Sequence, residues 1–122
     1  MRMVADHMEA GFLENIIDMV RHDKSLFGMI PFLLKDERQR VRIGGIAIIE
    51  ALYGECKKEI EEQVPLIGKI LKDAADTVIK GDAIYALSII GGEKVLAHLK
   101  EALNDPDAII RKEAREALEE LG

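Results

Sequence analysis

Three histidines and one cysteine are the residues of this sequence that could bind a transition metal or act as a nucleophile. His7, His22 and His98 are far apart along the chain, and none belongs to a metal-ligand spacing such as H-E-x-x-H. We therefore expect surface histidines, no metal site and no cofactor. Cys56 lies beside lysines near a predicted helix start, where thiols can be reactive, but no histidine is placed to act as its base. We expect a packed or idle thiol, no catalytic residue and no enzymatic activity.

The basic cluster Arg38-Gln39-Arg40-Val41-Arg42 could contact phosphate groups. Against that reading, the chain has a net charge of −6 and few aromatic side chains on which bases could stack. A solvated turn is the interpretation that we favour, and the composition disfavours nucleic acid as a ligand.

The composition indicates a small soluble protein. Hydrophobic residues make up 48% of its 122 residues and charged residues 33%. The longest uncharged runs are far shorter than the roughly 20 residues of a membrane-spanning helix, so we expect no membrane insertion. A single cysteine allows no internal disulfide, which is typical of a reducing compartment, and we expect a cytoplasmic location.

Apolar residues recur at helical spacing along the whole chain, and no segment alternates with the period of a strand. We predict a sequence of helices and turns without a sheet. Pro31 should kink its helix or follow its start, and Pro65 should either kink a helix or stand at the first position of one. Ser25 could cap a helix, and Gly54 should end one in the left-handed conformation. The expected helices cover residues 4–22, 26–35, 41–53, 56–72, 78–90, 93–103 and 108–121.

A short sequence motif is repeated along the chain. Leu34-Lys35-Asp36, followed by Gly54, is repeated as Leu71-Lys72-Asp73, followed by Gly91. A related motif, Leu103-Asn104-Asp105, is followed by Gly122. A period of roughly 30–40 residues is typical of stacked helical hairpins. Small residues such as Ala83 and Ala114 recur on the shared inner face, where they let helices approach closely.

The last two repeats resemble the short HEAT-like repeats of the PBS-lyase type. The residues that carry the resemblance are Asp105-Pro106-Asp107, Ile110-Arg111, Ala114, Ala117-Leu118 and Leu121-Gly122. The likeness extends over residues 26–122, and the first repeat departs from it because Ile46 and Ile49 replace the expected alanines. The predicted fold is all-α: a short right-handed α-solenoid of about three hairpins preceded by one extra helix. We predict a single domain with an N-terminal helix at 1–24 and repeats at 25–54, 55–91 and 92–122, the last with a C-terminal cap.

The resemblance implies a structural ladder of polar residues, in which a turn aspartate of one repeat meets a basic residue early in a second helix. The matching residues here are Asp36, Asp73 and Asp105 with Arg42, Lys80 and Arg111.

The outer side of the second helices is the candidate binding face. If the shared residues point inward, the residues left outside are apolar in the first two repeats and charged in the third, which looks like a polar end cap. An apolar face requires a cover, and the helix at 4–22 or a partner could supply it. The predicted partner-binding residues are Ile48, Ala51, Ile84, Tyr85 and Ser88.

The resemblance therefore implies a non-catalytic protein–protein interaction or scaffold module, which binds another protein or a second copy of itself on the face of the second helices. The alternatives are an accessory or lyase-related enzyme subunit and, less favoured, a nucleic-acid-binding protein.

Overall fold

The computed structural model describes Ala5 and residues 13–121. Every regular element in this part of the chain is a helix, which confirms the predicted all-α array of paired helices. The elements are α2 (Leu13–His22), η1 (Lys24–Gly28), α3 (Met29–Leu34), α4 (Gln39–Leu52), α5 (Lys57–Glu61), α6 (Val64–Asp73), α7 (Thr77–Ile90), α8 (Glu93–Ala102) and α9 (Ala108–Leu121). None of the described helices is long and apolar enough to cross a membrane.

The chain forms two compact units, Met1–Gln63 and Val64–Gly122. The division falls between α5 and α6, inside the segment 55–91 that we predicted as one repeat. The repeat boundaries themselves stay a prediction.

Unit 1 is built around the hairpin of α3 and α4, which pack against each other. Their side chains are almost wholly apolar on the inner side, where Leu33, Leu34 and Ile49 are fully buried. Gly45 allows the two helices to approach, because a Cβ atom at this position would lie 3.2 Å from both Leu33 Cβ and Leu34 Cδ2. The result is a tightly packed pair of helices.

Helix α2 packs against both α4 and η1. Ile16 and Val20, four residues apart on one side of α2, are buried, while Met19 is exposed. The segment 4–12, including Phe12 and Met8, lies outside the described residues apart from Ala5. Within unit 1, α2 therefore supplies at least part of the cover that α4 needs.

Several helix ends differ from the sequence prediction. Asp23 rather than Ser25 caps η1, because its carboxylate accepts a hydrogen bond from the Ser25 backbone N–H at 3.1 Å. Pro31, by contrast, follows the start of α3, which is one of its two predicted placements, and its missing N–H costs little in this first turn. Gly54 lacks the expected left-handed conformation, since the described residues with positive φ are Gly91 and Gly92. The expectation for Gly54 was wrong, because Tyr53 closes α4 with an α-helical backbone.

The segment 56–72 contains two helices rather than one kinked helix. The short α5 ends at Glu61, and α6 begins at Val64 with Pro65 as its second residue. Proline is tolerated there because the first-turn N–H groups have no intrahelical partner.

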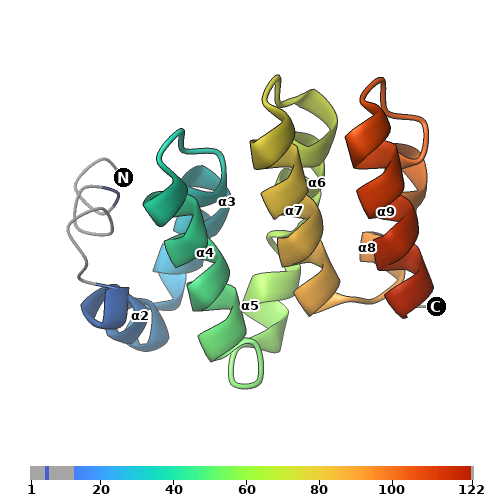
Figure 1. Ribbon diagram of the computed structural model, residues 1–122. Coiled ribbons are helices and arrows are strands. Elements are labelled where there is room, and N and C mark those ends of the chain that lie inside the picture. The colour runs from blue at the N-terminus through green and yellow to red at the C-terminus, as the bar shows by residue number, and fades with distance from the viewer. Residues whose placement is uncertain (1–4, 6–12, 122) are drawn as a thin grey trace. The chain divides into compact units, whose positions relative to one another are not determined.

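Unit 2 consists of two hairpins, α6–α7 and α8–α9. Helix α7 packs on α9 and α6 packs on α8, so the second helices form one layer and the first helices another (Figure 1). Asp76 caps α7 by accepting hydrogen bonds from the backbone N–H groups of Val78 at 2.7 Å and Ile79 at 3.2 Å. Gly91 and Gly92, with φ of 67° and 92°, make the turn from α7 to α8.

Candidate functional site

The predicted partner-binding residues divide into buried and accessible ones. The Ile48 side chain is 0% exposed and that of Ile84 only 4%, so neither is accessible to a partner in the folded protein. Tyr85 is 54% exposed, Ala51 is also exposed, and Ser88 is half-buried with its hydroxyl donating to the Ile84 carbonyl oxygen at 2.8 Å. The expectation that Ile48 and Ile84 form an exposed apolar face is therefore corrected.

The burial of Ile48 follows from the helix register. Counted from the first residue of each second helix, Ile48 of α4 is equivalent to Ala86 of α7 and Ala117 of α9, and all three are buried. Matching the repeats by Leu34-Lys35-Asp36 and Leu71-Lys72-Asp73 shifts this alignment by one residue and places Ile48 beside Tyr85 instead. Arg42, Lys80 and Arg111 are each the fourth residue of a second helix, and aligning the repeats on these basic residues would have given the correct register.

An apolar stripe does reach the surface of unit 2, on α7. Val78, Gly81, Tyr85 and Ser88 follow one another at helical spacing, and both Val78 and Tyr85 are more than half exposed. Ile109, the equivalent of Val78 on the neighbouring α9, is exposed to the same degree as Val78. Val78 and Ile109 were not predicted as binding residues; their shared place in the first turn of a second helix was the available signal.

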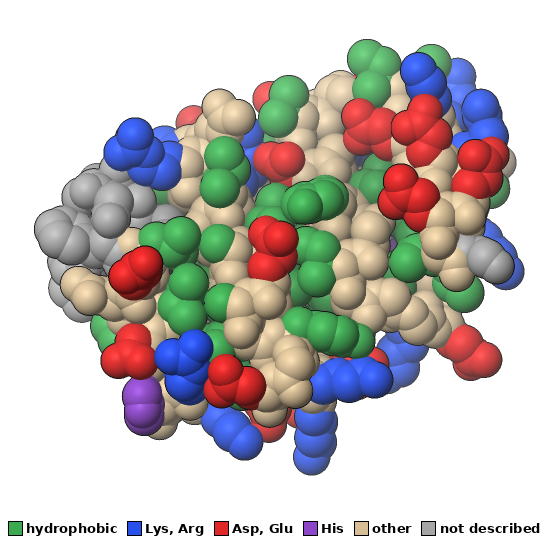
Figure 2. All heavy atoms as spheres, turned by 60° about the horizontal axis from the view of Figure 1, so that its bottom comes forward, with side chains coloured by type: hydrophobic (Ala, Val, Ile, Leu, Met, Phe, Trp, Pro, Cys, Tyr) green, Lys and Arg blue, Asp and Glu red, His purple; other side chains and the backbone are tan. Residues whose placement is uncertain are grey.

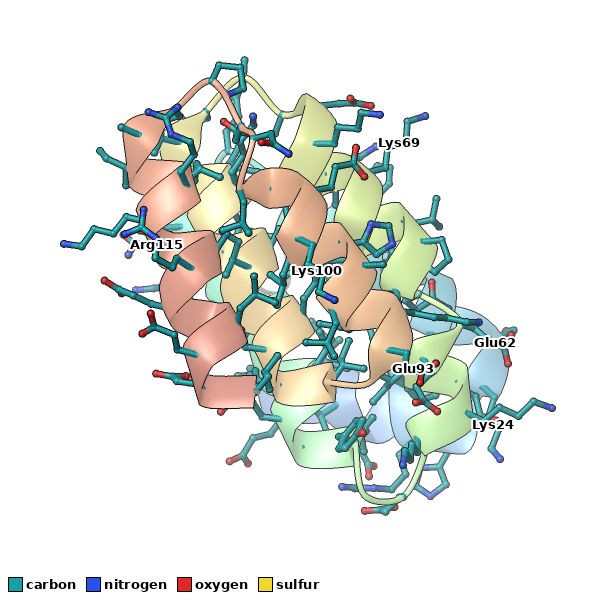
Figure 3. All side chains as sticks on the ribbon, turned by 90° about the vertical axis from the view of Figure 1, so that its right-hand side faces the viewer. Lys24, Glu62, Lys69, Glu93, Lys100 and Arg115 are labelled. Carbon is teal, nitrogen blue, oxygen red and sulfur yellow. The ribbon has the colours of Figure 1, made fainter. Side chains whose placement is uncertain are left out.

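Charged side chains border this stripe on α9. Figure 2 shows acidic side chains gathered over α9, at the right of the view. The sequence of α9 contains the glutamates Glu113, Glu116 and Glu119. In Figure 3, Arg115 lies on the side of α9 that faces away from α6 and α8, whereas Lys69 lies on the side of the first helices. The stripe of α7 and the charges of α9 thus belong to the outer surface of the second-helix layer.

The junction between the two hairpins of unit 2 is polar and buried. Lys80 Nζ lies 2.7 Å from Asp105 Oδ2, and these residues are 9% and 8% exposed. Asp105 Oδ1 also accepts the Asp107 backbone N–H at 2.9 Å. Beside this pair, the Thr77 hydroxyl donates to Asp107 Oδ2, and this hydrogen bond is the main cause of the lowered pKa of Asp107. Lys80 and Asp105 make a rung of the kind that the ladder prediction describes.

The other basic residues of the predicted ladder fold back on their own turns. Arg42 Nη1 donates to the carbonyl oxygens of Asp36 and Glu37, both at 2.8 Å. Arg111 Nη1 does the same to the carbonyl oxygens of Asp105 and Pro106, at 2.7 and 3.0 Å. Each guanidinium therefore ties the start of a second helix to the turn before it.

Asp73 does not occupy the turn position of Asp36 and Asp105. It is the exposed last residue of α6, and the residue six positions before Lys80 is Ala74. Asp36 and Asp105 stand six positions before Arg42 and Arg111. The ladder prediction for Asp73 is therefore one residue out of register, for the same reason as that for Ile48.

A cavity of about 340 Å³ lies in unit 2, between α6, α8 and the turn that precedes α9. His98 lines it, half-buried, together with Gly68, and the pair Lys72 Nζ–Glu101 Oε1 borders it at 3.2 Å. Within the described part of the chain, no three His, Cys, Asp or Glu side chains are placed to hold a metal ion. Cys56 is buried and His22 is exposed.

Gly68 and His98 should be energetically coupled. A Cβ atom at Gly68 would lie 2.3 Å from ring atoms of His98, so Gly68→Ala must displace the imidazole. In the His98→Ala background the same change should stabilise the protein by roughly 0.5–1 kcal/mol, since alanine favours a helix over glycine. Urea unfolding of both single variants and the double variant measures this coupling. Equal effects of Gly68→Ala in the two backgrounds would contradict the packing.

A sequence model described as HEAT repeats matches residues 28–119, which is most of the chain. The searches of curated proteins and of solved structures found no match.

Proposed function

The chain belongs to the HEAT repeat family, and we propose that it is a non-catalytic module that binds another protein through the outer surface of α7 and α9. HEAT repeats generally mediate protein–protein interaction. The observation that supports this surface is the exposed apolar stripe on α7, with Ile109 beside it on α9. Val78 and Tyr85 lie two helical turns apart on α7, and Ile109 is the equivalent of Val78 on α9, so a partner that lies across the second-helix layer could cover all three.

Tyr85 is the central residue of the proposed surface. Aromatic side chains that combine an apolar ring with a polar end dominate many protein interfaces. Ser88 lies one turn further along the same stripe. Ala51 is exposed on α4 of unit 1, and we keep it as a proposed partner-binding residue of that unit, separate from the α7–α9 surface of unit 2.

Tyr85→Glu should abolish partner binding without unfolding the protein. The matched control is Leu66→Glu, because Leu66 is 52% exposed on α6 in the other layer while Tyr85 is 54% exposed. Proteins retained from an extract of the source cells are compared by mass spectrometry, with light scattering to detect self-association. We expect wild type and Leu66→Glu to retain the same proteins, or the same dimer, and Tyr85→Glu to lose them. Identical retention and identical mass for all three would contradict the proposal.

A further inference from the structure

The Glu113 carboxylate lies directly against the backbone of α7. A Cβ atom at Gly81 would be 2.9 Å from Glu113 Oε2, so the carboxylate of α9 occupies the space that the missing side chain of Gly81 leaves. Gly81 is the residue between Val78 and Tyr85 in the stripe. A half-buried negative charge therefore interrupts the apolar surface at its centre.

The surroundings of Glu113 do not compensate this charge. Burial raises the pKa of the Glu113 carboxyl, and the nearby carboxylates of Glu116, Asp82 and Asp107 raise it further. In the part of the chain that the structure describes, no hydrogen bond or ion pair reaches the Glu113 carboxylate, and Lys112 Nζ lies 4.0 Å from Glu116 Oε1 instead. Burial and the three neighbouring carboxylates all act against the charged form of Glu113, so a cation placed beside its carboxylate would be favourable.

The exposed stripe and the uncompensated charge together identify the chemistry of a complementary partner. Apolar side chains would cover Val78, Tyr85 and Ile109, and a lysine or arginine would meet Glu113 between them. The net charge of −6 on the whole chain would favour the approach of a positively charged segment.

We propose that the α7–α9 surface binds a basic protein segment that combines aliphatic or aromatic side chains with a lysine or arginine placed against Glu113. This inference rests on the proposed function, and it adds the chemical class of the partner. The apolar stripe makes the surface, while the position of Glu113 over Gly81 determines which charge the partner must bring.

An array of peptides with randomised composition tests the partner class directly. The full chain is applied at about 0.15 M salt, where attraction between distant charges is screened. We expect the retained peptides to be enriched in lysine or arginine together with aliphatic or aromatic residues. Glu113→Lys should weaken binding of these peptides by about tenfold or more, because two positive charges would then meet at the contact.

The matched control is Glu93→Lys, which changes the net charge equally but places it on α8 in the other layer. It should leave peptide binding within about twofold of wild type, because screening suppresses its long-range effect. Circular dichroism of each variant verifies the fold, and Glu113→Lys should fold because it removes a carboxylate from a negative field.

The outcomes separate this inference from the proposed function. Enrichment of acidic or uncharged peptides that depends on Tyr85 would overturn the inference and leave the binding surface in place. Equal losses in Glu113→Lys and Glu93→Lys would also overturn it, since only the net charge would then matter. Retention of no peptide, or of peptides that Tyr85→Glu still binds, would count against both.

Discussion

Replacing Asp105 with alanine should lower the free energy of unfolding by about 3–5 kcal/mol, because it leaves the buried ammonium group of Lys80 without its partner. The two atoms of the pair are 2.7 Å apart, and water has little access to either side chain. The change also removes the acceptor for the Asp107 backbone N–H at the start of α9. Urea unfolding followed by circular dichroism measures the loss.

Two controls show whether the cost comes from the stranded charge. Adding Lys80→Met to Asp105→Ala should recover much of the lost stability, since an apolar side chain then replaces the unpaired ammonium group. Lys72→Met breaks the Lys72–Glu101 pair, whose side chains are mostly exposed, and should change stability by less than about 1 kcal/mol. If Asp105→Ala were as mild as Lys72→Met, the Lys80–Asp105 rung would not stabilise the junction between the hairpins.

Ile48→Glu should destabilise the protein by about 4 kcal/mol or more and should prevent stable folding of unit 1. Ile48 is completely buried on α4, and a carboxylate there would lose its hydration without gaining a partner. The expected result is loss of helicity and of the cooperative unfolding transition, measured by circular dichroism in urea.

Tyr85→Glu is the matched comparison for Ile48→Glu, because the same side chain is introduced on the outward face of a second helix. It should change the free energy of unfolding by less than about 0.5–1 kcal/mol, since Tyr85 is mostly exposed. Ile48 is the tenth residue of α4 and Tyr85 the ninth residue of α7, so the two positions are equivalent only in the alignment that was based on Leu34-Lys35-Asp36 and Leu71-Lys72-Asp73. Comparable stability of the two variants would show that Ile48 is not in the core.

The local chemistry of the sequence was sufficient to predict most of the helices. Periodic apolar residues located α7 and α9 to within one residue of their observed ends. The repeated motif and the pattern from Asp105 to Leu121 also identified the family, which the match over residues 28–119 supports. These features depend on contacts within a few residues, so the order of residue types contains them.

The helix ends that were mispredicted depend on alternatives that are nearly equal in local energy. Asp23 and Ser25 can both cap a helix, and the carboxylate of Asp23 takes that role by also accepting the Ser25 hydroxyl at 2.6 Å. A glycine near a helix end can take the left-handed backbone or leave it, and Gly54, which follows the C-terminal cap Tyr53 of α4, does not take it.

The sequence alone determined that this protein is an array of helical hairpins, that its inner faces are apolar and that the outer side of the second helices is where the repeats differ. Only the tertiary structure decided which apolar residues remain outside, because a shift of one residue turns a helix by about 100° and exchanges a buried position for an exposed one. It buried Ile48 and Ile84, exposed Val78 and Tyr85, and placed Glu113 against Gly81. Contacts between helices, which no local pattern contains, made that choice.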